Sequence, residues 1–101
     1  MLVQVRMLAF HDENDPKFRE VTIPDDADNP LEAVYYYGQN DFQPVENCCS
    51  LSVGDVIFYE NEKFLISPLG FYKLSETEFN ELESLERRER HFRTYEFKPN
   101  S

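Results

Sequence analysis

Hydrophobic and polar positions alternate in two short segments near the start of the chain. In residues 2–10, Val3 and Val5 would face one way and polar side chains the other, which is typical of a strand. Residues 17–23 alternate again, and residues 11–16 between them are charged or turn-forming. The pattern therefore predicts an antiparallel hairpin with a polar tip.

A helix start follows this hairpin. Asn29 can cap a first turn, with Pro at the first helical position and Glu three residues after the cap. Apolar residues then recur at helical spacing, and Gly38 is placed to end the helix. We predict a helix that runs to about Tyr37, followed by a polar loop over residues 39–47.

Residues 50–74 predict a three-stranded meander. The segments 56–59, 63–67 and 71–74 are rich in aromatic and aliphatic residues, and polar, Gly or Pro residues separate them. The turn at Gly54 leads into the first of these strands.

A second helix is expected after the meander. Ser75 and Glu78 have the spacing of a capping box, which marks a helix start. Phe79, Leu82 and Leu85 then form a narrow apolar stripe, and Phe92 is a candidate to continue it. The stripe suits a helix that lies across a sheet.

These elements predict the fold class α+β, with a mainly antiparallel sheet made of the N-terminal hairpin and the meander, and two helices. A chain of 101 residues suits one domain. We expect this domain to span residues 1–92, with a flexible C-terminal tail over residues 93–101. We expect no signal peptide, and no apolar run approaches the ~20 residues that a membrane span needs.

The charge of the chain is strongly negative and unevenly spread. It has 20 Asp and Glu against 10 Lys and Arg, a formal net charge of −10. Residues 1–86 carry a net −13 and residues 87–101 a net +3. Such a surface repels phosphate backbones and anionic lipids, so we expect no direct binding to nucleic acid or membrane. The expected partner is a protein with a basic surface, and a merely solvated face is the alternative.

Candidate catalytic and metal-binding residues lack the patterns that such chemistry needs. His11 and His91 have no recognisable orienting partner. Cys48 and Cys49 are adjacent in an acidic context that disfavours a thiolate, and reduced thiols suit a cytoplasmic protein. Two acidic clusters lack the spacing of a calcium loop: Asp12, Glu13 and Asp15, and Asp25, Asp26 and Asp28. We therefore expect no enzyme activity, no metal and no cofactor.

The tyrosine run over residues 35–37 is the best candidate for a binding site. Successive helical residues lie ~100° apart, so the three rings cannot all be buried on one stripe. Tyrosine is favoured at interfaces, and the polar side chains behind Gly38 supply hydrogen-bonding groups. We predict that the partner-binding residues are Tyr36, Tyr37, Gln39, Asn40, Asp41 and Phe42. Core packing with a capped helix end is the alternative.

The segments 50–57 (SLSVGDVI) and 70–74 (GFYKL) resemble the YodL-type domain of uncharacterised phage and plasmid proteins. That pattern begins SLSVSDVV, continues through a short hairpin and ends with GF, and here Gly54 replaces the last Ser of the opening motif. The resemblance covers only residues 50–74. It implies a mobile-element context and no activity.

The function expected from these features is that of a non-catalytic protein-binding domain encoded by a phage or similar mobile element. It would cover a basic surface of its partner. A sharper form is an anti-defence inhibitor whose carboxylates stand where phosphates would bind. A structural or assembly module is the alternative. The sequence leaves the partner and the oligomeric state open.

Overall fold

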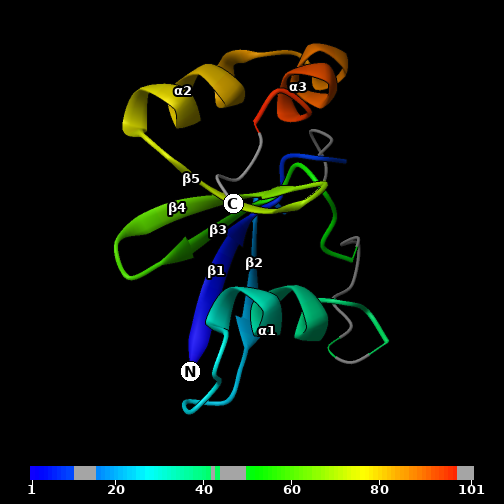
Figure 1. The fold of residues 1–101 in the computed structure, drawn as a ribbon. Coiled ribbons are helices and arrows are strands. Elements are labelled where there is room, and N and C mark those ends of the chain that lie inside the picture. Colours follow the sequence, from blue (N-terminus) through cyan, green and yellow to red (C-terminus); the bar gives the residue numbers. More distant parts are fainter. Residues whose placement is uncertain (11–15, 42, 44–49, 98–101) are drawn as a thin grey trace.

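The computed structural model describes residues 1–10, 16–41, 43 and 50–97, and Figure 1 shows their fold. The elements, in chain order, are β1 (Leu2–Arg6), β2 (Phe18–Thr22), α1 (Pro30–Tyr37), β3 (Val56–Tyr59), β4 (Glu62–Ser67), β5 (Gly70–Leu74), α2 (Glu76–Ser84) and α3 (Arg87–Thr94). The predicted α+β class, hairpin and meander are confirmed.

A single antiparallel sheet holds all five strands, in the order β2-β1-β3-β4-β5. The hairpin and the meander join because β1 pairs with β3, where Val5 lies opposite Ile57. Between β3 and β4 the chain turns in two residues, Glu60 and Asn61, whose φ angles of 51° and 65° match the tight turns that twisted hairpins favour.

The sheet separates two cores, because successive strand residues point to opposite faces. On one face, Val5 and Ile57 pack in a buried cluster with Val34 of α1. On the other face, Val56 packs in a second cluster that includes Phe79 of α2. Figure 1 shows α1 on one side of the sheet and α2 and α3 on the other, so the fold has three layers.

The predicted second helix is two helices, so the expectation of two helices in the fold is wrong. After α2, Leu85 and Glu86 adopt extended backbone with ψ angles of 151° and 156°, and α3 then begins at Arg87. The apolar stripe is confirmed at Phe79 and Leu82, which are buried. It does not continue to Phe92, which is 63% exposed, because the break reorients the helix that carries it.

Packing against the sheet continues past residue 92, where we expected the tail to begin. The Thr94 side chain is buried, and its hydroxyl donates to the Arg90 carbonyl at 2.8 Å. The Phe97 ring is also buried and lies 4.9 Å from the Tyr72 ring of β5, centroid to centroid. Residues 93–97 therefore belong to the packed body, and residues 98–101 lie outside the described part of the chain.

Gly54, in the turn before β3, is expected to be sensitive to any added side chain. Its φ of +106° lies where side chains are strained, and a Cβ there would lie 3.2 Å from the Ala9 Cβ. We expect Gly54→Val to lower the free energy of unfolding by about 1 kcal/mol or more, measured by urea denaturation. Gln4→Val, at an exposed strand position, is the control and should change it by less than ~0.5 kcal/mol. An unchanged midpoint for Gly54→Val would contradict the strained conformation.

Candidate functional site: a cleft beside α1

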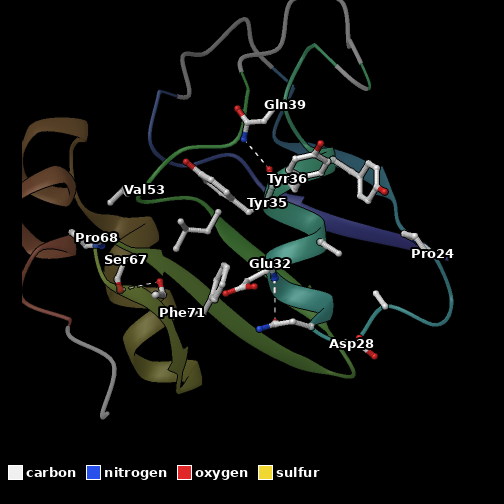
Figure 2. Close-up of a pocket in the computed structure, with 16 residues that line it drawn as sticks. Pro24, Asp28, Glu32, Tyr35, Tyr36, Gln39, Val53, Ser67, Pro68 and Phe71 are labelled. Carbon is white, nitrogen blue, oxygen red and sulfur yellow. Dashed lines mark hydrogen bonds between the residues drawn. The ribbon is translucent and has the colours of Figure 1, made fainter.

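A cleft of about 820 Å³ opens between α1 and the end of the β4–β5 hairpin (Figure 2). Val53, Ile66 and Phe71 supply apolar side chains on the sheet side. The turn after β4 forms one end, where the Ser67 hydroxyl donates to the Gly70 carbonyl at 3.0 Å. The volume lies within the ~300–1,000 Å³ range that is usual for binding pockets.

The cleft exists because α1 is short. It has 8 residues and packs against β2 and β3, which leaves the β4–β5 side of that face without a covering helix. Phe64 and Phe71 are only partly buried there. On the opposite face, the outward-facing residues of β1 and β2 are mixed: Gln4 and Glu20 are polar, whereas Leu2 and Phe18 are exposed apolar residues. The uncovered β4–β5 region beside α1 presents apolar surface of the kind that marks binding sites.

The wall formed by α1 combines aromatic rings with negative charge. Tyr35 and Tyr36 line the cleft and are 40% and 54% exposed. Glu32 lines it one turn earlier on the helix, and Asp28 lines it from the loop before α1. No Lys, Arg or His lines the cleft among the residues that the structure describes. The cleft therefore favours a ligand that carries apolar groups and positive charge.

The structure brings three of the predicted partner-binding residues to this cleft. Tyr36, Tyr37 and Gln39 all line it. The rings of Tyr36 and Tyr37 meet edge to face, 5.1 Å apart between centroids. The Gln39 amide nitrogen donates to the Tyr35 carbonyl at 2.8 Å, which Figure 2 shows as a dashed line. These residues therefore remain candidates for partner contact.

The other predicted residues do not line the cleft. Asn40 accepts a hydrogen bond from the buried Arg19 guanidinium at 2.7 Å, and its N–H donates to the Ser50 hydroxyl at 2.9 Å. Those contacts give Asn40 a structural role outside the cleft, and its part in partner binding stays a prediction. Asp41 is exposed beyond the end of α1. Phe42 lies outside the described residues.

Gly38 ends α1 as predicted, but for a different reason from the one expected. Its N–H donates to the Val34 carbonyl at 2.8 Å, while its φ of −77° is an ordinary value. A Cβ at this position would overlap the buried side chain of Leu51. The glycine therefore allows the segment around Leu51 to pack against the end of α1, where the Leu51 N–H donates to the Gly38 carbonyl at 3.2 Å.

The contribution of the β4–β5 hairpin to the cleft was missed in the sequence, as were two buried charged residues elsewhere. Arg19, 1% exposed, points from β2 beneath the loop that follows α1 and also donates to the Gln43 carbonyl. Asp55, also 1% exposed, accepts hydrogen bonds from the N–H groups of Leu8 and Ala9. In the sequence, Arg19 looks like any charged residue in a strand and Asp55 like any charged residue in a turn, so no local pattern indicates that they are buried.

The other candidate residues show no assembled chemistry in the described ranges. His91 is exposed on α3, where its ring contacts those of Phe92 and Tyr95. No group of three or more His, Cys, Asp or Glu within the described residues could hold a metal ion. The same part of the chain has no helix long and apolar enough to cross a membrane. His11, Cys48, Cys49 and the acidic cluster at 12–15 lie outside it.

Comparison with known proteins gives no relative from which a function could be transferred. No family model, curated protein or solved structure matches this chain. The resemblance to the YodL-type domain therefore stays a prediction.

Proposed function

We propose that this protein is a non-catalytic protein-binding domain whose cleft beside α1 receives a basic segment of a partner. The observation that supports this proposal is the composition of the cleft. Its lining includes the apolar side chains of Ile66 and Phe71 as well as the carboxylates of Asp28 and Glu32, and no basic residue is among its described lining. A partner would place apolar groups in the cleft and Lys or Arg at its rim.

The charge of the whole chain supports the same class of partner. A formal net charge of −10 accelerates the approach of a basic protein and repels nucleic acid. Binding would act by occlusion, because the partner's basic surface would be covered. In the sharper form of the proposal, the protein acts in the cytoplasm for a phage or mobile element and blocks a host defence protein that itself binds nucleic acid.

A second surface favours an assembly subunit as the alternative function. Phe92 on α3 and Tyr95 directly after it are exposed, and the Arg87 guanidinium lies 5.3 Å from the ring centroid of the exposed Phe10. This aromatic and basic surface is separate from the cleft in both position and charge. A protein with two distinct docking surfaces could link two partners rather than inhibit one.

The proposed site is tested by substitutions in the cleft. Purification of tagged protein from its native host would identify the partner. Calorimetry should then show that Glu32→Gln combined with Tyr36→Ala weakens binding about tenfold or more, since a few central residues dominate most interfaces. Wild-type affinity should also fall as salt rises.

Phe92→Ala is the matched control, because it removes an exposed aromatic ring from α3 and leaves the cleft unchanged. If the affinity for the partner is unchanged by the cleft substitutions and by salt but is lost with Phe92→Ala, the docking surface is on α3. The assembly function is then favoured.

A further inference from the structure

The two edge strands of the sheet, β2 and β5, differ in whether their outward-facing backbone groups have hydrogen-bond partners. At the β2 edge, the side-chain amide of Gln43 bonds to both outward-facing backbone groups of Thr22. Its Oε1 accepts from the Thr22 N–H at 2.9 Å, and its Nε2 donates to the Thr22 carbonyl at 2.7 Å. The loop after α1 thus completes part of this edge in the way a neighbouring strand would.

The β5 edge is left open by the residues that the structure describes. Ile66 of β4 bonds towards β3, since its N–H donates to the Asp55 carbonyl at 2.9 Å and its carbonyl accepts from the Gly54 N–H at 2.8 Å. The neighbours of Ile66 in β4, Leu65 and Ser67, must therefore direct their backbone groups to β5, where Leu65 lies opposite Tyr72. The backbone groups of Tyr72 consequently face β4. Those of its neighbours, Phe71 and Lys73, face away from the sheet, and no described residue is bonded to them.

We infer that the partner segment is extended and adds a sixth strand to the sheet by pairing with the outward backbone groups of Phe71 and Lys73. This inference rests on the proposed function and specifies the shape of the ligand. Extended peptides commonly bind open sheet edges in this way, with main-chain hydrogen bonds giving affinity and side-chain pockets giving specificity. Here the pocket would be the cleft, because Phe71 lines it from β5.

Acidic groups flank β5 on both faces of the sheet. On the α1 side, Glu32 lines the cleft with Phe71. On the other side, the Tyr72 hydroxyl donates to the Glu78 carboxylate at 3.2 Å, and the hydrogen bond from the Ser75 N–H holds the pKa of Glu78 below its usual value. Successive side chains of an added strand would point to these two faces in turn. Basic residues on both sides of the strand would therefore be favoured.

The same charges argue against a second copy of this chain as the added strand. Pairing β5 with β5 would bring the acidic flanks of two molecules together, and each molecule has a formal net charge of −10. The one basic side chain on β5, Lys73, is already paired with Glu62 at 2.7 Å. A basic segment of another protein is the occupant that the charges favour.

The test uses the whole protein and short peptides. A ribosome-displayed library of random peptides of ~10 residues, about twice a usual strand length, is selected on the wild-type protein, and enriched peptides are synthesised. We expect these peptides to carry Lys or Arg. Their binding should slow hydrogen exchange at the Phe71 and Lys73 amides.

Lys73→Pro should weaken the same peptides about tenfold or more, because it removes an outward N–H and places a bulky ring at the edge. Lys73→Ala is the matched control. It removes the same side chain and its ion pair but keeps the N–H, and it should retain binding within about threefold. Urea denaturation of both variants checks that they fold.

If Lys73→Pro does not fold, peptides N-methylated at alternate residues test the β5 edge on the wild-type protein. Only the set that is methylated on the pairing side should lose binding.

The outcomes separate the inference from the proposed function. If Glu32→Gln with Tyr36→Ala weakens the peptides but Lys73→Pro and N-methylation do not, the cleft binds its ligand through side chains alone, as it would bind a helix. The inference then fails and the proposed function stands. If Lys73→Pro weakens binding and the cleft variant does not, the strand pairing stands and the cleft proposal fails. Enrichment of no peptide overturns both, and a wild-type dimer that Lys73→Pro dissociates would make a second copy the occupant.

Discussion

Replacement of Asp55 by Asn is expected to lower the free energy of unfolding by about 3 kcal/mol. The Asp55 carboxylate is buried between β1 and β3 and accepts three backbone hydrogen bonds, from Leu8 at 3.0 Å, from Ala9 at 2.9 Å and from Ser52 at 2.9 Å. An Asn side chain can accept with one oxygen only, and its NH₂ would face at least one backbone N–H. The cost follows from leaving a buried backbone N–H opposite a group that cannot accept a hydrogen bond, and such an unsatisfied donor costs about 1–3 kcal/mol.

Urea denaturation of the wild type and Asp55→Asn at pH 7 measures this cost. Asp41→Asn is the matched control, because it makes the same chemical change at an exposed carboxylate. The control should shift the free energy of unfolding by less than ~0.5 kcal/mol. Equal stability of the two variants would show that Asp55 does not hold the two strands and the turn together.

Comparison of the wild type with Asp55→Asn also shows how the stability contributed by Asp55 depends on pH. Burial raises the pKa of Asp55 to about 6 in the folded protein, against the opposing effect of its three N–H donors. Because this value lies above the unfolded value of ~3.9, the folded state binds the proton more tightly. The contribution of Asp55 to stability therefore rises as the pH falls through 6 towards 4. The advantage of wild type over Asp55→Asn should grow by about 1 kcal/mol between pH 7 and pH 5, and a shrinking advantage would show that the N–H bonds outweigh burial.

Arg90→Ala is expected to cost about 2 kcal/mol of unfolding free energy, the second largest effect. The Arg90 guanidinium donates to the carbonyls of Leu82 at 2.9 Å, Leu85 at 2.7 Å and Leu8 at 2.7 Å. The first two carbonyls end α2, where helical partners run out. The third follows β1, so one side chain from α3 connects the break between the helices to the sheet. Each such charged hydrogen bond is worth about 1.5–3 kcal/mol when buried, and partial exposure of Arg90 reduces the total.

Thermal unfolding and hydrogen exchange test the role of Arg90. Arg88→Ala, on the same helix with an exposed side chain, is the matched control and should cost less than ~0.5 kcal/mol. Arg90→Lys should recover only part of the loss, because one ammonium group cannot reproduce the planar fork of five donors. We expect faster amide exchange in α2 and α3 of Arg90→Ala. If amide exchange in α2 and α3 of Arg90→Ala stays at wild-type rates, Arg90 does not anchor these helices.

Local sequence patterns were sufficient to predict most of the secondary structure. The side chain of Asn29 caps α1, and Ser75 and Glu78 form the predicted capping box at the start of α2. Alternation placed Val3 and Val5 on a buried face. Each of these features depends on residues within a few positions of one another, so a local pattern is enough to predict them.

The candidate site could be predicted only in part. The tyrosine run correctly indicated that a ring would remain exposed, and Tyr36 is exposed beside the cleft. The same reasoning placed Asn40 in the site, but Asn40 does not line the cleft and its side chain bonds to Arg19. A polar side chain in a loop has the same local pattern whether it meets a partner or a buried guanidinium 21 residues away.

The sequence by itself thus determined the fold class, the strands and the helix starts, together with the acidic charge of the chain. Tertiary structure alone decided that β1 lies beside β3, that the last helix breaks at Leu85, and that the cleft forms between α1 and the β4–β5 hairpin. Each of these features joins groups far apart in the chain, such as Arg90 and the Leu8 carbonyl, 82 residues apart. Whether such groups meet depends on how the whole sheet and its two covering layers pack, and no local pattern of hydrophobic and polar residues records that.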